Sequence, residues 1–503
     1  MLTYHSDKAR TGQYLSEKVL NPGNVNFLKF GLRFVLGVDG KVDAQPLYKS
    51  RVSIPARGIH NVLYVATEHD SVYAFDADVG GAALWRVSML KTGETTSDDR
   101  GCSQVTPEIG ITATPVIDPS AGPHGTIYVV AMSRNGSGDY FQRIHALDMT
   151  TGFEEFGGPA TINASFPGKG DNSNGLMVIF DPAQYKERPG LLLLNGTVYT
   201  FWSSHCDARP YTGWIIAYNQ NTLARTAVAN ITPNGEGGAI WAAGAGPAAD
   251  PQGNIYFLVG NGTFDTTLNA SGFPIKGDFG NAFIKLSPLG SLHVADYFTM
   301  YNTVAESGAD QDLGSGGALV LPDMRDSLAR IRHLAVGAGK DTNIYLVDRD
   351  NMGKFRAAGD TNIYQKIVGG LMDREFAMPA YFNGTLYYGA ANAPIVALRF
   401  SLARLASVPS SMTNISFDYP GATPAISANG SVNGILWAAR NLTPAVLHAY
   451  DAADLSKQLY SSTQAPRGRD NFGAGNKFIT PTIANGKVYV GTQTGVGVFG
   501  LLP

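Results

Sequence analysis

The chain has 503 residues, a formal net charge of −3 and only 16% charged residues. Without a Lys/Arg-rich run, this charge excludes nucleic acid and anionic membrane surfaces as expected partners. No apolar stretch reaches the roughly 18 residues that a membrane-spanning helix needs, so no membrane association is expected.

One repeated pattern predicts the architecture. Each copy has a short apolar strand, a Gly turn, a VYV-type strand and a further strand near an Asp. The clearest copy covers residues 61–85, within a set of eight related copies. Such strands cannot bury their faces alone, whereas four-stranded sheets packed radially can. We predict an all-β protein: a single domain over residues 1–503 that forms an eight-bladed β-propeller of four-stranded antiparallel blades.

The blades follow one another along the chain, each beginning with an inner strand. A spare apolar segment at residues 26–36 precedes the first copy, and the last copy contains only three strands. We therefore predict that the N-terminal strand completes the C-terminal blade and closes the ring. Seven blades with a separate N-terminal strand are the alternative. The predicted inner strands begin at residues 44, 112, 190, 244, 316, 377, 421 and 479.

Four connections are much longer than the others. In a propeller, connections between blades and those within a blade between its second and third strands open onto the same face of the central channel. Long loops crowded on one face are typical of functional sites. We expect the site on this face. The long connections are residues 88–111, 157–189, 262–280 and 299–315.

The cysteines and N-glycosylation sequons indicate the cellular compartment in which the protein is expected. Cys102 and Cys206 could pair in an oxidising environment or remain two free thiols. The first ten residues are polar and do not resemble a signal peptide, as expected for a mature or trimmed form. N-x-S/T sequons indicate either N-glycosylation or ordinary hairpin chemistry. We expect a secreted glycoprotein, or one from a periplasm-like oxidising compartment. The sequons are Asn135, Asn163, Asn195, Asn230, Asn261, Asn269, Asn383, Asn414, Asn429 and Asn441.

Several segments resemble quinoproteins, the propellers that bind pyrroloquinoline quinone (PQQ). Residues 74–85, AFDADVGGAALW, resemble their tryptophan-docking repeat. Residues 237–262, 310–317, 339–350 and 203–219 resemble segments of methanol-dehydrogenase-type members. The resemblance implies Trp241 as the floor beneath the quinone, Asp312 as the catalytic base and Lys340 as the residue that contacts the quinone oxygens. It also implies calcium held by Asp207, Asn261 and Asp312.

These residue types suit that chemistry. Indole offers a large face for a tricyclic quinone, and Ca²⁺ prefers several hard oxygen ligands. The metal and the Lys340 ammonium would polarise the quinone carbonyl for hydride attack. Asp312 would take the proton of the substrate hydroxyl.

The chain also departs from that family. The vicinal pair of cysteines is absent, and Glu108 stands where the family has an Arg. The metal-ligand Glu of the family has no clear counterpart. Gly314 occupies the place of the second Asp of the lanthanide-type members.

Three functions remain open from the sequence. The first is a PQQ- and calcium-dependent dehydrogenase for a small alcohol or sugar, with an external electron acceptor. The second is a cofactor-free enzyme that binds an apolar small molecule, with Glu108, His205 and Lys340 as its catalytic residues. A fungal hetero-Diels–Alderase or cyclase of natural-product biosynthesis is one conceivable example. The third is a non-catalytic scaffold propeller.

Overall fold

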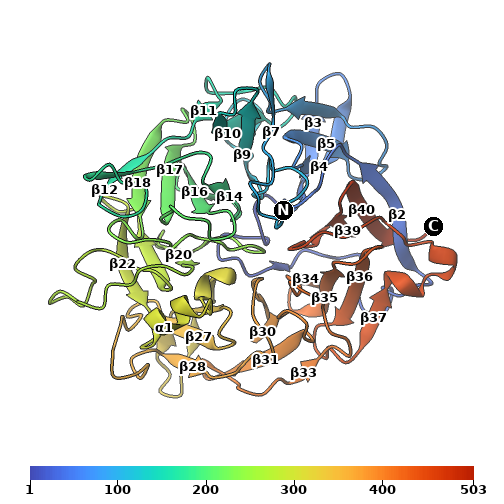
Figure 1. Ribbon diagram of the computed structural model, residues 1–503. Helices are drawn as coiled ribbons and strands as arrows, with labels where there is room; N and C mark the ends of the chain where they lie inside the picture. Colours follow the sequence, from blue (N-terminus) through green and yellow to red (C-terminus); the bar gives the residue numbers. More distant parts are fainter.

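A computed structural model describes residues 1–503, and its strands form eight sheets arranged in a ring (Figure 1). The predicted all-β, eight-bladed propeller is therefore confirmed. In every blade the first strand comes from one of the predicted inner segments.

Blade 1 contains β3 (Leu47–Ile54), β4 (Gly58–Ala66), β5 (Ser71–Asp76) and β6 (Trp85–Ser88). Blade 2 contains β8 (Val116–Asp118), β9 (Thr126–Asn135), β10 (Tyr140–Asp148) and β11 (Ala160–Thr161), with β7 (Glu94–Thr96) beside β9. Blade 3 contains β15 (Leu192–Leu194), β16 (Thr197–Ser203), β17 (Trp214–Asn219) and β18 (Arg225–Asn230), with β14 (Lys186–Glu187) beside β16.

The remaining blades follow the same order. Blade 4 contains β19 (Ala248–Ala249), β20 (Ile255–Leu258), β21 (Phe283–Ser287) and β22 (His293–Phe298). Blade 5 contains β23 (Leu319–Val320), β26 (Leu334–Ala338), β27 (Ile344–Asp348) and β28 (Gln365–Ile367). Blade 6 contains β29 (Ala380–Phe382), β30 (Thr385–Tyr388), β31 (Val396–Ser401), β32 (Arg404–Leu405) and β33 (Ser411–Met412). Blade 7 contains β34 (Ala425–Asn429), β35 (Val432–Arg440), β36 (Val446–Asp451) and β37 (Gln458–Ser461).

The eighth blade joins the two ends of the chain. Its strands β38 (Thr482–Ala484), β39 (Lys487–Gly491) and β40 (Gly495–Leu501) are completed by β2 (Phe30–Gly37), which pairs antiparallel with β40. The predicted closure by an N-terminal strand is confirmed. Short elements lie outside the blades: hairpins β12 (Ser165–Pro167) with β13 (Met177–Ile179) and β24 (Met324–Arg325) with β25 (Ile331–Arg332), helix α1 (Thr303–Gly308), and 3₁₀ turns at Leu313–Ser315, Ser462–Gln464 and Pro466–Gly468.

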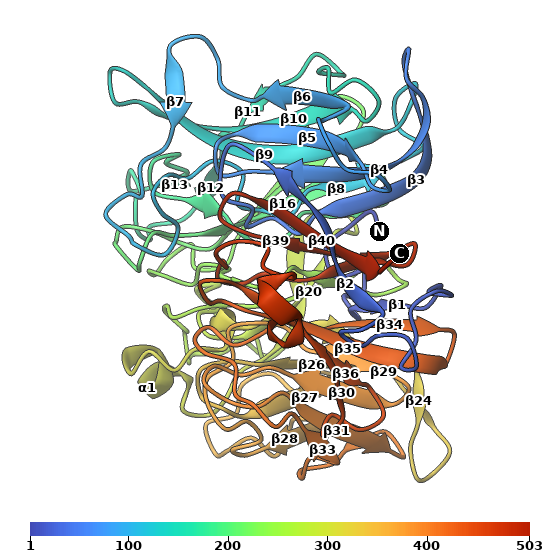
Figure 2. The ribbon, with the colours of Figure 1, turned by 90° about the vertical axis from the view of Figure 1, so that its right-hand side faces the viewer.

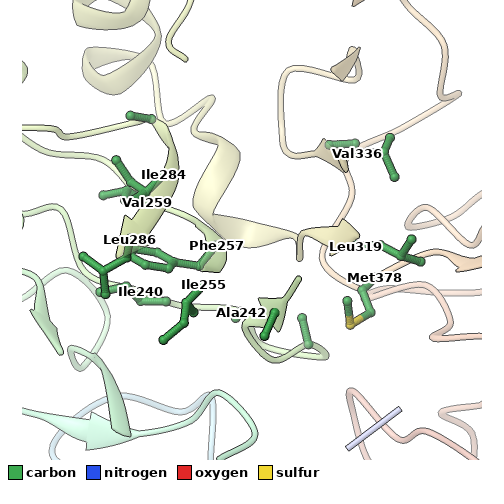
Figure 3. Packing of buried hydrophobic residues seen from close by; sticks show 14 of the residues in the cluster. Ile240, Ala242, Ile255, Phe257, Val259, Ile284, Leu286, Leu319, Val336 and Met378 are labelled. Atoms are coloured by element: carbon green, nitrogen blue, oxygen red, sulfur yellow. The ribbon is translucent and has the colours of Figure 1, made fainter. Parts of the chain in front are cut away.

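Burial explains why the central strands of a blade are almost wholly apolar. All four residues of β20 and all five of β26 are buried, because a neighbouring blade covers each face. The outermost strand β6 alternates between half-buried and exposed residues instead. The largest cluster contains 41 buried hydrophobic residues and extends from blade 3 to blade 6. Figure 3 shows part of it, with side chains of β20 and β21 gathered together and Leu319 beside Met378 of the next blade.

An N-terminal belt, residues 1–17, runs around the ring and was not predicted. The amide groups of inner strands donate hydrogen bonds to its carbonyl groups, and its strand β1 (Gln13–Tyr14) pairs parallel with β34. Two side-chain contacts reach the other blades, from Arg10 to the Leu191 carbonyl and from the Gly486 amide to Glu17. The belt therefore contacts every blade. In the other six blades, the amide groups that donate to belt carbonyl groups include those of Tyr48, Ile117, Ala249, Val320, Tyr381 and Ile426.

The two faces of the ring differ. In Figure 2 the termini lie on one side, whereas β7, β12, β13 and α1 lie on the opposite side. These elements belong to three of the four long connections, so these connections gather on one face, as expected. No helix in the structure has the length and apolar character required to cross a membrane.

Candidate functional site

A small cavity with about 60 Å³ of free volume lies among the long connections. This volume is below the range of about 300–1,000 Å³ that is usual for small-molecule sites. Four of the predicted site residues line it: Asp207, Trp241, Asp312 and Lys340. The other lining residues are Gln104, Arg188, Ala243, Ser315, Phe376, Tyr419 and Phe478.

A buried ion pair stands at the wall formed by blade 5. Asp312 is 1% exposed and precedes the 3₁₀ turn Leu313–Ser315, while Lys340 follows β26. The Lys340 Nζ atom lies 2.8 Å from an Asp312 carboxylate oxygen and 2.5 Å from one of Asp310. Burial raises the pKa of Asp312, and Lys340 partly offsets that effect. Burial alone would lower the pKa of Lys340, but the two carboxylates raise it above its ordinary value. Asp312 is therefore a buried carboxylate that faces an ammonium group at the cavity wall.

Trp241 forms an aromatic wall of the cavity. Its indole packs against Gly260, where a Cβ atom would lie 2.5 Å from the indole Cδ1 atom, so only glycine allows this approach. Tyr211 contacts the indole edge-to-face, with ring centroids 6.5 Å apart, and donates a 2.6 Å hydrogen bond to Asp207. Tyr211 thus connects the aromatic wall to the carboxylate, a role that sequence reasoning missed.

Asn261 lies in an adjoining open cleft rather than among the residues that line the cavity. Asp207 lines both spaces, so the two are neighbours. The amide nitrogen of Asn261 donates a 2.7 Å hydrogen bond to Asp310, while its Oδ1 atom is buried without a partner. Asp310 is a further acidic neighbour that the sequence analysis did not assign.

Gly314 cannot carry a second acidic side chain. A Cβ atom there would lie 2.2 Å from the backbone nitrogen of Gly260. The missing Asp of the lanthanide-type pattern therefore has a steric cause. In residues 1–503, no three or more His, Cys, Asp or Glu side chains gather as a metal-binding group.

Glu108 and His205 do not line the cavity. The Glu108 carboxylate lies within 3.0 Å hydrogen-bonding distance of His69 Nδ1 and accepts a 2.7 Å hydrogen bond from Thr96. His205 is buried, and neither of its ring nitrogens has a hydrogen-bond partner. Burial and the nearby Lys186 lower the pKa of His205 to about 3, so the ring is neutral near pH 7.

A disulfide between Cys102 and Cys206 joins two loops beside the cavity. Cys102 lies in the long connection between blades 1 and 2, and Cys206 lies between β16 and β17 of blade 3. Gln104 and Asp207, within two residues of these cysteines, both line the cavity. The bridge therefore ties down two segments of its wall.

Replacing both cysteines with serine should lower the free energy of unfolding by about 2–4 kcal/mol, because the bridge closes a loop of 104 residues. Urea unfolding of the double variant would measure this. Dithiothreitol should destabilise the wild type by a similar amount and leave the double variant unchanged. Equal stability of all three samples would contradict the prediction.

No protein-family model and no curated protein matches the chain. Solved structures do. A quinohemoprotein alcohol dehydrogenase from Comamonas testosteroni is 15% identical with a TM-score of 0.63, covering 99% of this chain and 80% of its own. Another, from Pseudomonas putida HK5, gives 13% identity, a TM-score of 0.63 and the same coverage. A europium-containing methanol dehydrogenase gives 14% identity and a TM-score of 0.59, covering 98% of this chain and 90% of its own.

Proposed function

The chain has the propeller fold found in quinohemoprotein alcohol dehydrogenases, and from this premise we propose that it is a quinone-dependent dehydrogenase of a small alcohol or sugar. One observation carries the proposal: Trp241, Asp207, Asp312 and Lys340 line one cavity. The cofactor would be PQQ with calcium, and electrons would pass to an external acceptor.

The residues present are compatible with both groups. The unpartnered, buried Oδ1 atom of Asn261 is free to bind a cation, and the Asp207 and Asp312 carboxylates supply further hard oxygen ligands. Trp241 offers an aromatic face, and Phe376, Tyr419 and Phe478 add further aromatic side chains to the cavity lining. Lys340 and Arg188 supply positive charge for an anionic quinone.

In this proposal the bound quinone would accept a hydride from the alcohol carbon. Asp312 accepts the proton of the substrate hydroxyl, which requires its ionised form. Lys340 holds that carboxylate in place through its 2.8 Å contact. Tyr211 fixes Asp207 by its hydrogen bond, so the second carboxylate stays directed along the same wall. The aromatic side chains exclude water from the reacting groups.

A second candidate is a cofactor-free enzyme whose substrate is itself a planar conjugated molecule. One observation favours it: the Lys340 ammonium already pairs with the Asp310 and Asp312 carboxylates. Aromatic walls and fixed cations would orient such a substrate for cyclisation or cycloaddition. Of the three residues expected for this activity, Lys340 lines the cavity, whereas Glu108 and His205 do not.

Spectroscopy and metal analysis separate the two candidates. The purified protein, incubated with PQQ and Ca²⁺ and then desalted, should retain quinone absorbance and about one calcium ion per chain. Trp241→Ala should lose most of the bound quinone, because the stacking face is removed. A wild-type protein that retains neither quinone nor calcium would refute the dehydrogenase and favour the cofactor-free enzyme.

We also propose that the protein works in an oxidising compartment, as a secreted or periplasmic protein would. The Cys102–Cys206 disulfide supports this proposal. Of the sequons, Asn230 is buried and donates a hydrogen bond to Thr212. We therefore exclude it from the proposed glycosylation sites.

A further inference from the structure

A second, deeper cavity adjoins the first and has a different electrostatic character. Its free volume is only about 20 Å³, which suits a small polar group rather than a whole ring. It shares Gln104, Arg188, Ala243 and Phe478 with the first cavity. Tyr4 of the N-terminal belt also lines it, and its hydroxyl group donates a 2.6 Å hydrogen bond to the Gly244 carbonyl. The belt therefore closes part of this cavity.

Arg188 is the most unusual residue of the deep cavity. It is 5% exposed, and its Nη1 atom donates a 2.8 Å hydrogen bond to Gln104. The Nη2 atom is buried without a partner, and the guanidinium carbon lies 4.5 Å from the ring centroid of Phe478. No carboxylate forms an ion pair with Arg188 in residues 1–503. A buried charge that lacks its counter-ion is costly, and an unsatisfied donor adds to that cost.

The surrounding charges do not compensate Arg188. Lys41 and Lys477 also line the cavity, whereas Asp43 is its only acidic lining residue, and its one ion pair with Lys41 is loose at 3.7 Å. Glu68 lies nearby, but burial, reinforced by Asp43, raises its pKa to about 8. Burial therefore favours the neutral form of Glu68. Three cations face one carboxylate, which leaves the deep cavity positively charged.

We propose that the deep cavity is an oxyanion subsite, in which Arg188, Lys477 and Lys41 bind the carboxylate or ionised enol of a ligand whose conjugated ring lies against Phe478 and Tyr419. The guanidinium group gives the directional hydrogen bond, because Nη2 is free. Lys477 lies 5.5 Å from the ring centroid of Tyr419, which places positive charge beside the same aromatic wall. The ligand class is then a conjugated organic acid.

This inference rests on the proposed function only in taking the adjoining cavity as the reaction site. It deepens that function by requiring an acidic group on the molecule bound there. The anion itself could belong to the substrate or to the tricarboxylate quinone, and the two sources share one chemistry. Competition between two probes distinguishes them.

Benzoate is a suitable probe, with benzamide and benzyl alcohol as neutral analogues. Isothermal titration of the full chain should show benzoate binding at least about tenfold more tightly than either analogue, because only benzoate forms charge-assisted hydrogen bonds. Arg188→Gln should weaken benzoate binding by about 10- to 100-fold. Lys477 is only half-buried, so the Lys477→Gln variant is less prone to misfold than Arg188→Gln. It should also weaken benzoate binding. Lys18→Gln, an exposed control, should leave it unchanged.

A competition experiment between PQQ and benzoate identifies the source of the anion. Displacement of benzoate by the quinone assigns the subsite to a carboxylate of the quinone, whereas simultaneous binding assigns it to the substrate. Both results support an oxyanion subsite. Benzoate binding without any retention of quinone would support the subsite and refute the dehydrogenase. The inference is overturned if benzamide binds as tightly as benzoate, or if folded Arg188→Gln and Lys477→Gln proteins bind benzoate like the wild type.

Discussion

Asp312→Asn should lower kcat for alcohol oxidation by about 10²- to 10⁴-fold, the usual contribution of a positioned general base. The substitution preserves the shape of the side chain and removes its ability to take a proton. Asp312 lines the cavity and is held 2.8 Å from Lys340, so the variant retains a polar contact to that residue. Steady-state kinetics of the quinone-loaded enzyme with an artificial electron acceptor would measure the effect.

The pH dependence gives a second readout of the same residue. Burial raises the pKa of Asp312, and only its ionised form accepts a proton. Activity should therefore be low at pH values below this raised pKa and should increase as the pH rises through it. The Asp312→Asn variant should lack this increase in activity with pH. Glu236→Gln removes an exposed carboxylate that pairs with Arg209 in the neighbouring cleft, and it should retain near wild-type activity. A folded, quinone-loaded Asp312→Asn enzyme with wild-type kcat would exclude Asp312 as the base.

Arg10→Ala should lower the free energy of unfolding by about 3–5 kcal/mol, because it leaves buried carbonyl groups without donors and opens a void. Arg10 is fully buried in the N-terminal belt. Its guanidinium group donates hydrogen bonds to the carbonyl oxygens of Tyr4, Leu191 and Pro247 at 2.7, 3.0 and 2.9 Å. One side chain thus joins the belt to blades 3 and 4.

Thermal and urea unfolding, followed by circular dichroism, would test this effect. Arg10→Lys keeps the charge but cannot reach all three carbonyl groups in a fork, so its stability should lie between those of wild type and Arg10→Ala. Lys18→Ala, at an exposed position just beyond the belt, should unfold like the wild type. An Arg10→Ala protein with an unchanged unfolding midpoint would show that the belt contributes little to stability.

The architecture could be predicted because the repeat carries local signals in every copy. Gly turns, VYV-type strands and the spare segment at residues 26–36 indicate eight blades and their closure. The belt carries no such signal. Its residues mostly offer backbone carbonyl groups to strands far along the chain, and any side chain can accompany that kind of contact.

The site was predictable only where its residues lie in family-like segments. Trp241, Asp312 and Lys340 fall in such segments and meet in the cavity. Arg188 and Phe478 do not, although one signal could have indicated them: each stands one or two residues before a predicted inner strand. Ala243, Ser315, Phe376 and Tyr419 share that position and also line the cavity. The position of a residue within the repeat therefore predicts whether it lines the cavity, once it is known which end of each blade faces the channel.

Glu108 and His205 show the limit of reading loops from the sequence. Both belong to segments on the channel face, but direction and partner decide whether a side chain reaches the cavity. Glu108 contacts His69 instead, and His205 is buried and is not among the lining residues. Neither outcome follows from residue type or spacing. Asp310 was not predicted as a site residue, because only its contacts with Asn261 and Lys340 in the folded structure connect it to the site.

The N-terminal belt also bears on how the protein matures during translation. Its residues leave the ribosome before any of the blades, yet their hydrogen-bond partners extend to Gly486, and β2 must wait for β40. A nascent chain can assemble individual blades as they emerge, but the belt cannot be fully seated until synthesis is nearly complete. Until then the leading segment remains accessible to chaperones and proteases. Tyr4, which lines the deep cavity, is among these late-docking residues, so ligand binding should be one of the last properties that the growing polypeptide acquires.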